Sequence, residues 1–586
     1  MQRVQPRPGP FPPRSELGAA LAACRQAFIS IAVFSGISNV LMLTGSIFML
    51  EIYDRVLPSR SVPTLVGLSV LALVLFLSMG CLDLIRGRIL VRVGASLDES
   101  LSGRVYETLV RLPLHAGNRS DGLQPLRDLD SIRSFLSGLG PIALCDLPWL
   151  PIYLAVCFAF HFWIGTTALI GAIILTSLTL LTEHLTKRPM LETTRFGHAR
   201  NGLAEASQRN AEALAAMGML SRIAARWHDA NRQYMQSQRL ASDVAGGLGA
   251  ISKVLRMVLQ SAVLAVGAYL VIYQQATAGI IIAGSILSAR ALAPVDLAIA
   301  NWKGFVSARQ GWARLTRLLA AFPAPAAVLA LDPPSNTLAV EGISAAPPGH
   351  QKLVVQDISF TLQAGCGLGI IGPSASGKSS LARCLVGVWT PVRGKVRLDG
   401  AALDQWNTEA LGAHIGYLPQ DVELFGGTVA QNIARFEPDA PPEAIVAAAK
   451  AAGVHDLIVK LPEGYETQVG DQGTALSSGQ AQRIALARAL YGDPFLVVLD
   501  EPNSNLDAEG DEALTRAIFR VRERNGIVVV VAHRPSAISG VDHVLVMSNG
   551  RQQAFGPKDE VLARVLQRPA LPRPLKIVPE KGGSTS

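Results

Sequence analysis

The first half of the chain alternates long apolar runs with long polar segments. Crossing a hydrocarbon core about 30 Å thick takes about 20 apolar residues in a helix. Runs of that kind cover residues 27–50, 62–82, 141–162, 164–181 and 257–273, and a sixth begins at 276. Arg290 and Asp296 interrupt the sixth run, and Pro294 predicts a kink or an end in its helix. We still expect six spans, because an odd number would leave the rest of the chain on the wrong side of the membrane.

The charge of the connecting segments predicts the orientation. The segments between the second and third spans and between the fourth and fifth spans are rich in arginine, whereas the short turns have balanced charges or no basic residue. The positive-inside rule therefore places both long segments and both termini in the cytoplasm. Each long segment reads mostly as helix, and at about 1.5 Å per residue each could extend a helical hairpin more than about 30 Å from the membrane.

Ionisable residues inside the spans have two interpretations. Asp146, Arg256, Arg290 and Asp296 either line a polar route through the membrane or lie at helix ends with their charges in the interface. The sequence favours neither reading over the other.

Composition excludes several classes of function. The formal net charge is +8, but the basic residues are scattered through loops without interleaved aromatic residues, so no nucleic-acid partner is predicted. The six cysteines form no C-x-x-C pair and have no histidines at metal-binding spacing. Neither a disulfide framework nor a zinc site is therefore expected.

After about residue 336 the pattern becomes that of a mixed α/β domain, and it contains a phosphate-binding motif. The short apolar run 368–371 leads into Gly-Pro-Ser-Ala-Ser-Gly-Lys-Ser at 372–379, which matches the Walker A pattern. In such a loop backbone N–H groups surround the phosphates, the lysine reaches the β- and γ-phosphates, and the last serine binds Mg²⁺. The candidate ATP-binding residues here are Gly372, Pro373, Ser374, Ala375, Ser376, Gly377, Lys378, Ser379 and Ser380.

Two further apolar runs end in residues suited to ATP hydrolysis. Run 495–499 reads as a central parallel strand and ends at Asp500 and Glu501. Asp500 is the candidate Mg²⁺ ligand, and Glu501 is the candidate to polarise the attacking water. Run 527–532 ends at His533, at the sheet edge where ligands of doubly wound folds bind. The alternative, two acids that merely cap a strand, is disfavoured by the Walker A motif.

Residues 476–480, Leu-Ser-Ser-Gly-Gln, resemble the LSGGQ signature of ATP-binding cassette proteins, with Ser478 in place of the first glycine. Gln420 and residues 504–507 match the Q-loop and the D-loop of that family. The resemblance implies an ATPase that uses ATP and Mg²⁺, with a nucleotide held between the Walker A motif of one chain and the signature of another. It therefore implies a homodimer. It assigns nucleotide contacts to Ser477, Ser478, Gly479, Gln480 and Asp507, catalytic roles to Glu501, His533 and Gln420, and Mg²⁺ to Ser379, Gln420 and Asp500.

The adenine-packing residue departs from the family pattern. Such cassettes usually carry an aromatic residue before Walker A, and this chain has none between Phe322 and Phe360. Pro347, Pro348 or His350 is expected to substitute, unless selectivity for the base is loose.

The membrane half is similar to the permease/ATPase subunits of type I secretion in Gram-negative bacteria. The stretches that carry the similarity are 41–45, 52–63, 146–149, 211–219 and 344–348. The similarity implies a multi-pass inner-membrane protein with a cytoplasmic cassette, which recruits a periplasmic adaptor and an outer-membrane channel and exports an unfolded polypeptide with a carboxyl-terminal signal. The alternatives are a lipid or drug exporter of the same architecture, and a regulator that has lost hydrolysis, against which the intact motifs argue.

The predicted fold is multi-domain. An all-α transmembrane domain of six helices precedes an α/β P-loop domain, the ATP-binding cassette. The expected boundaries are a cytoplasmic amino-terminal segment at 1–26, the transmembrane domain at 27–312, a linker at 313–335, the cassette at 336–564 and a disordered tail at 565–586.

Overall fold

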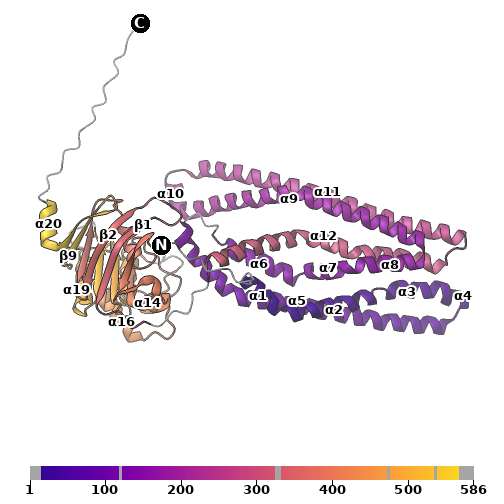
Figure 1. Ribbon diagram of the computed structural model, residues 1–586, viewed down its shortest axis with the longest axis horizontal. Helices are drawn as coiled ribbons and strands as arrows, with labels where there is room; N and C mark the ends of the chain where they lie inside the picture. The colour runs from indigo at the N-terminus through magenta and orange to yellow at the C-terminus, as the bar shows by residue number, and fades with distance from the viewer. Residues whose placement is uncertain (1–14, 118–121, 324–330, 471–475, 533–537, 567–586) are drawn as a thin grey trace, which may run out of the picture. The chain divides into compact units, whose positions relative to one another are not determined.

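The computed structural model describes residues 15–117, 122–323, 331–470, 476–532 and 538–566 (Figure 1). The chain divides into two compact units. The first comprises Met1–Leu109 and Gly122–Pro323, and the second comprises Val110–Asp121 and Ala324–Ser586.

All regular elements described in the first unit are helices. They are α1 (Glu16–Ala23), α2 (Arg25–Leu41), α3 (Thr44–Glu51), a π-helix (Ile52–Val56), α4 (Leu57–Ser59), α5 (Val62–Ala116), α6 (Gln124–Ser137), α7 (Gly140–Asp146), a 3₁₀ turn (Leu147–Trp149), α8 (Leu150–Phe160), α9 (Phe162–Arg209), α10 (Ala211–Ala216), α11 (Leu220–Ile272) and α12 (Ala278–Ala321). Helices α9 and α11 lie side by side over most of their length, and α12 runs beside α6, α7 and α8 (Figure 1).

Six helical stretches in the described residues are long and apolar enough to cross a membrane, as predicted. They are Arg25–Ser59, Val62–His115, Gly140–Phe160, Phe162–Arg209, Leu220–Ile272 and Ala278–Ala321. At about 1.5 Å per residue, α11 measures about 80 Å, far more than a hydrocarbon core of about 30 Å. The paired helices α9 and α11 therefore continue beyond the membrane, as their polar sequences predicted.

The sixth span continues through Pro294. The sequence predicted a kink or an end at this proline; helix α12 is continuous from Ala278 to Ala321, so the helix does not end there. The apolar segment of α12 is 56% buried, more than that of any other span in the described residues. Helices α3, α6, α7 and α8 pack against α12. Such packing offsets the hydrogen bond that a proline cannot donate.

A buried polar network joins the first three spans. Asn39 of α2 donates a hydrogen bond to Asp146 Oδ1 of α7 at 2.8 Å, and Arg86 of α5 lies 3.4 Å from the same oxygen. The Tyr153 hydroxyl of α8 donates to Asn39 Oδ1 at 2.9 Å. Because Asp146 is only 6% exposed, it ties helices together instead of lying at a solvated helix end.

Three further interactions hold α12 in place. Asp296 forms an ion pair with Arg256 of α11. Arg314 donates two hydrogen bonds to the buried Asp128 of α6, at 2.8 and 2.6 Å. Asp54, in the π-helix near the end of the first span, accepts a hydrogen bond at 2.9 Å from the backbone N–H of Gly279, in the first turn of α12.

The second unit contains two sheets. The smaller has the order β2-β1-β4-β5, from β1 (Thr337–Ala345), β2 (Val355–Gln363), β4 (Arg393–Leu398) and β5 (Ala401–Ala402). The larger has the order β10-β9-β3-β8-β7-β6, from β3 (Gly367–Ile371), β6 (Ile415–Leu418), β7 (Leu496–Asp500), β8 (Ile527–Val531), β9 (His543–Ser548) and β10 (Arg551–Pro557). All pairs in the larger sheet are parallel except β9 with β10.

Helices accompany both sheets. They are α13 (Lys378–Leu385), α14 (Thr408–His414), α15 (Val429–Ile433), α16 (Pro442–Ala451), α17 (His455–Val459), α18 (Ser478–Leu490), α19 (Ala508–Glu523) and α20 (Lys558–Leu566), with 3₁₀ turns at Leu403–Gln405 and Gly464–Glu466.

The central strands are apolar on both faces because each face has its own core. On β7, Val497 and Leu499 belong to one apolar cluster, whereas Leu496 and Val498 belong to another. Strand β8 alternates in the same way. The continuous apolar runs of the sequence therefore reflect burial on both sides of a parallel sheet, which brings the carboxyl ends of β3 and β7 to the same edge.

Candidate functional site

The predicted phosphate-binding loop connects β3 to α13, and two of its glycines are sterically required. Gly372 and Gly377 have φ of 155° and 95°. A Cβ at Gly372 would lie 2.1 Å from the carbonyl oxygen of Met547, and one at Gly377 would lie 2.5 Å from that of Val354. The loop is thus fitted closely against the backbone of β9 and of the residue that precedes β2, and only glycine suits these two positions.

Lys378 begins α13 and folds back over the loop. Its ammonium donates hydrogen bonds to the carbonyl oxygens of Gly372 and Pro373, at 3.0 and 2.9 Å. Burial lowers the pKa of Lys378, while the negative charges of Glu501 and Asp500 oppose that shift. The two carbonyls therefore hold the ammonium at the loop, and a phosphate would be a stronger acceptor than either of them.

Ser379 and Asp500 meet across the sheet edge. The Ser379 hydroxyl donates to Asp500 Oδ1 at 3.1 Å, while Asp500 Oδ2 is buried and has no hydrogen-bond partner among the described residues. Burial raises the pKa of Asp500; the hydrogen bond from Ser379 lowers it, and the charge of Glu501 raises it again. A hydroxyl oxygen beside an unsatisfied carboxylate oxygen suits a small, hard cation, so these residues fit Mg²⁺.

Glu501 follows β7 in a strained backbone conformation. Its φ is 51°, in the left-handed region that non-glycine residues rarely adopt. Its N–H donates to the carbonyl of Val531 at the end of β8, at 3.0 Å. Strain of this kind persists only where the surroundings hold the residue, and it is frequent at functional sites.

The signature residues form the start of α18. Ser477 is the N-cap: its hydroxyl accepts from the N–H of Gln480, and the Gln480 side chain accepts from the N–H of Ser477. Ser478 is exposed, whereas a Cβ on Gly479 would lie 2.8 Å from the carbonyl oxygen of Asn505. The departure from the family signature therefore falls on the position that has room for a side chain.

Gln482 was missed by the sequence analysis. It is 2% exposed, and its Nε2 donates to the carbonyl of Pro502 at 2.7 Å and to that of Glu501 at 3.3 Å. Its Oε1 accepts from the N–H of Asn505 at 3.1 Å. One buried amide thus joins the signature helix to the turn that carries Glu501. A single glutamine two residues after a signature has no pattern that would reveal this contact.

Gln420, Asp507 and His533 were also predicted as site residues. Gln420 is exposed just after β6, and Asp507 is the N-cap of α19, accepting from the N–H of Gly510 at 2.9 Å. That hydrogen bond, together with Arg483, lowers the pKa of Asp507. His533 lies outside the described residues. Among the candidates for adenine packing, the N–H of His350 donates to the carbonyl of Pro347 in a turn after β1, and Pro348 lies within that turn.

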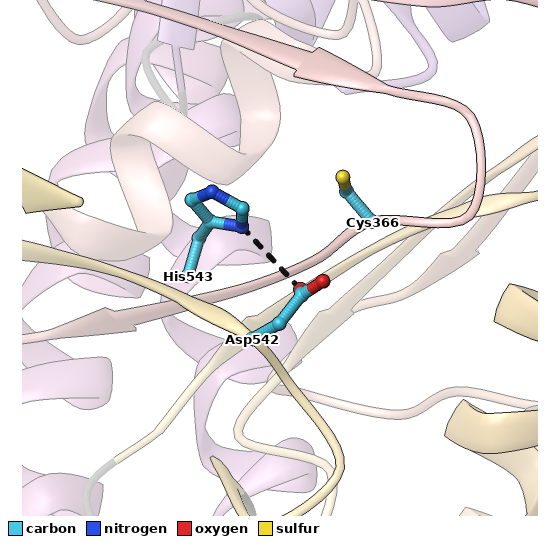
Figure 2. A group of neighbouring side chains, drawn as sticks. All are labelled: Cys366, Asp542 and His543. Carbon is cyan, nitrogen blue, oxygen red and sulfur yellow. Dashed lines mark ion pairs between the residues drawn. The ribbon is translucent and has the colours of Figure 1, made fainter. Parts of the chain in front are cut away.

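A second cluster of polar residues lies at the opposite end of β3. The structure places the potential ligand atoms of Cys366, Asp542 and His543 within 4.8 Å of one another, and Figure 2 shows the His543 ring beside the Asp542 carboxylate, 3.5 Å away. Both oxygens of Asp542 are already used, by the N–H of Gly367 at 2.7 Å and by Arg522 at 2.9 Å. A guanidinium on the carboxylate disfavours a second cation, so the cluster fastens β3 to β9.

Two family models match the chain. Residues 28–295 match the model described as the ABC transporter transmembrane region, and residues 355–504 match the model described as ABC transporter.

The curated relatives match over nearly the whole chain. The type I secretion system ATP-binding protein PrsD of Rhizobium meliloti is 60% identical over 96% of this chain and 97% of its own length. The alpha-hemolysin translocation ATP-binding protein HlyB of Proteus vulgaris is 28% identical over 93% of this chain and 77% of its own length. Among solved structures, a bacterial Atm1-family ABC exporter with ATP bound has a TM-score of 0.80 at 23% identity, covering 93% of this chain and 97% of its own, which shows the same fold.

Proposed function

We propose that this chain exports an unfolded polypeptide carrying a carboxyl-terminal signal. The premise is that the chain belongs to the ABC transporters and, within them, to the type I secretion ATP-binding proteins. The chief support is the 60% identity to a type I secretion ATP-binding protein, which extends through both halves of the chain. The chain is thus an ATP-hydrolysing, multi-pass membrane exporter with a cytoplasmic cassette.

The predicted site residues have complementary roles in the proposed mechanism. The Walker A loop and Lys378 bind the β- and γ-phosphates, and Ser379, Asp500 and Gln420 would hold Mg²⁺. Mg²⁺ in that position would neutralise charge that develops on the phosphates. Glu501 orients the attacking water and accepts its proton, and His533 contacts the γ-phosphate.

The proposed working unit is a homodimer. Ser477, Gly479 and Gln480 of one chain complete the nucleotide site of its partner, with Ser478 and Asp507 beside them. A ligand that bridges two bodies favours their closed arrangement, so ATP closes the cassettes and hydrolysis releases them. The proposed partners are a periplasmic adaptor and an outer-membrane channel, in keeping with the type I secretion relatives.

A secretion assay tests the cargo. Wild-type protein should restore export of a polypeptide with a carboxyl-terminal secretion signal to a strain that lacks this exporter, and Lys378→Ala should not. The matched control is Lys395→Ala, because Lys395 belongs to β4 of the smaller sheet and its exposed ammonium lies 3.5 Å from Asp404. The same polypeptide should change the ATPase rate of the purified wild-type protein.

Other results would exclude the proposal. An ATPase rate that responds to lipid or to small amphipathic drugs, and not to the polypeptide, would identify a lipid or drug exporter. Secretion by Lys378→Ala at the wild-type level would separate transport from ATP binding and contradict the mechanism.

A further inference from the structure

A buried side chain, that of Gln482, lies between the signature turn and the segment 501–505 that follows β7. It is only 2% exposed, and every hydrogen bond printed by its amide goes to this segment. We propose that Gln482 is a positioning residue that holds Glu501 and links it to the signature turn of the same chain, so that the nucleotide at one site of the dimer influences Glu501 at the other. This inference rests on the ATP-hydrolysing dimer proposed above.

The neighbours of the amide fix its orientation. The backbone N–H of Asn505 donates to it at 3.1 Å, so the atom that faces this N–H is the oxygen, Oε1. The nitrogen, Nε2, then faces the carbonyl oxygens of Pro502 at 2.7 Å and of Glu501 at 3.3 Å. The reverse orientation would oppose donor to donor and acceptor to acceptor, so only one orientation satisfies all of these groups.

The nitrogen has more acceptors than hydrogens. An amide nitrogen carries two hydrogens, and Nε2 of Gln482 also lies 3.2 Å from the hydroxyl oxygen of Ser504. The short bond to Pro502 uses one hydrogen, so the carbonyl of Glu501 and the hydroxyl of Ser504 compete for the other. A small rotation of the amide strengthens one of these bonds and weakens the other. Two discrete hydrogen-bond arrangements of this kind are what carries coupling between sites.

The same face of α18 contacts the segment at two more points. A Cβ on Gly479 would lie 2.8 Å from the carbonyl oxygen of Asn505, and Arg483 forms an ion pair with Asp507. Positions 479, 482 and 483 are spaced so that they lie on one face of a helix. A displacement of the signature turn is therefore passed directly to the residues that follow β7.

The two ends of this contact belong to different nucleotide sites in the proposed dimer. The signature turn, with Ser477 and Gly479, contacts the nucleotide held by the partner's Walker A loop. Glu501 acts on the nucleotide held by its own chain. Within the described residues, the hydrogen bonds of Gln482 do not reach the Walker A loop, so its loss should change the position of Glu501 and not the binding of ATP.

Steady-state ATP hydrolysis by the full-length protein in nanodiscs tests the proposal. Gln482→Met nearly keeps the volume of the side chain and removes its hydrogen bonds. It should lower kcat at least about tenfold, because misplacing a catalytic group by about 1 Å can cost about 10²-fold. The ATP concentration at half-maximal rate should stay within about twofold of wild type, because ATP binding is not involved. The Hill coefficient, at most about 2 for two sites, should exceed about 1 in wild type and fall to about 1 in the variant.

Asn432→Leu is the matched control. Asn432 is another fully buried amide of the cassette, and it accepts from the N–H of Phe425 and donates to its carbonyl, both at 2.9 Å. An apolar residue of similar size removes these hydrogen bonds, so the Tm should fall about as much as in Gln482→Met. The control should keep the wild-type kcat and Hill coefficient.

A second variant covers the case in which Gln482→Met does not fold. Gln482→Glu keeps the acceptor for the N–H of Asn505 and loses the donors, so it should show the same fall in kcat. Equal losses of kcat in the control and the Gln482 variants, a loss in neither, or an unchanged Hill coefficient would overturn the proposal.

Mixed dimers show which chain's Gln482 matters. When one chain carries Lys378→Ala, the hydrolysing site uses the Walker A loop and Glu501 of the other chain. Gln482→Met in that other chain should lower hydrolysis at least about tenfold, whereas Gln482→Met in the Lys378→Ala chain should not. A loss only in the second arrangement would assign Gln482 to the signature turn alone and overturn the proposal.

The outcomes separate this inference from the proposed function. A mixed dimer that hydrolyses ATP at the same rate wherever Gln482→Met is placed rejects only the role of Gln482. A wild-type protein that does not hydrolyse ATP rejects the proposed mechanism as well. The secretion assay reports on the cargo and leaves the role of Gln482 to the ATPase measurements.

Discussion

Glu501 combines a left-handed backbone with a position directly after the Asp500 carboxylate, and the surrounding hydrogen bonds hold it there. Its N–H is fixed to the end of β8, and Gln482 donates to its carbonyl. The side chain is therefore positioned by backbone contacts that a conservative substitution preserves.

Glu501→Gln should lose at least roughly 10²-fold in ATP turnover, because a positioned acid–base group typically contributes that much. Binding of a fluorescent ATP analogue should persist. Glu509→Gln, an exposed acid in the first turn of α19, serves as control and should hydrolyse ATP at the wild-type rate. Near-normal turnover in Glu501→Gln would remove this residue from the mechanism.

Asp500 should reduce stability at neutral pH in the nucleotide-free protein. Its pKa is raised by burial, so the folded state binds the proton more tightly than the unfolded chain, whose Asp pKa is about 3.9. The free energy of unfolding therefore falls as pH rises from that value through the raised pKa. Asp500→Asn removes the charge and should raise the Tm at pH 7.5 more than at pH 5. Each kcal/mol gained in the free energy of unfolding corresponds to a rise of about 2–4 °C in Tm.

Differential scanning fluorimetry at the two pH values checks this expectation, with the exposed Asp404→Asn as control. The same Asp500→Asn variant should lose Mg²⁺-dependent hydrolysis. A Tm difference from wild type that does not change with pH would show that ionisation of Asp500 has no effect on stability.

At the scale of secondary-structure elements, buried polar contacts join the helices of the membrane half. The Asp146 carboxylate of α7 accepts from Asn39 of α2 and lies near Arg86 of α5, and both charged side chains are buried. Removing one member of a buried ion pair leaves the other charge unpaired, whereas removing both is far less damaging.

Asp146→Ala should therefore lower the Tm of the purified protein strongly, by an amount that corresponds to about 3–5 kcal/mol. The double variant Asp146→Ala with Arg86→Leu should recover part of that loss, and a double-mutant cycle measures the coupling. Additive losses would mean that the two side chains do not interact energetically.

The predictability of each element depended on whether its pattern is local. Strands β7 and β8 and the spans were predicted because burial on both faces, or in lipid, requires continuous apolar runs. The sequence left a kink or an end open at Pro294, because the effect of this proline is set by the helices packed around α12, which no local pattern records. The Gln482 bridge and the Cys366 cluster were invisible for the same reason: they join segments far apart in the chain.

For the molecule as a whole, the proposed working unit is a dimer. The Walker A loop and Asp500 meet at the edge of the large sheet, while the signature turn starts a different helix, α18. In the proposed dimer, each of these two half-sites is completed by the other chain.

A mixed dimer tests this arrangement. A Ser477→Arg chain combined with a Lys378→Ala chain should retain one complete site made from the intact half of each. Hydrolysis should therefore reappear in the mixture, although each homodimer is inactive. Tagged chains purified through two affinity steps provide the sample, and an inactive heterodimer would argue against sites shared between chains.

The carbonyl of Asn505 leaves no room for a side chain at Gly479, and this constraint can guide the search for related transporters in genomes. Steric contact requires glycine at the second position of the motif, Gly479. The position before it is exposed and accommodates a serine, Ser478. A search pattern that insists on both glycines would pass over transporters such as this one. A pattern that keeps the second glycine and the buried glutamine three residues after it would follow the physical constraint instead.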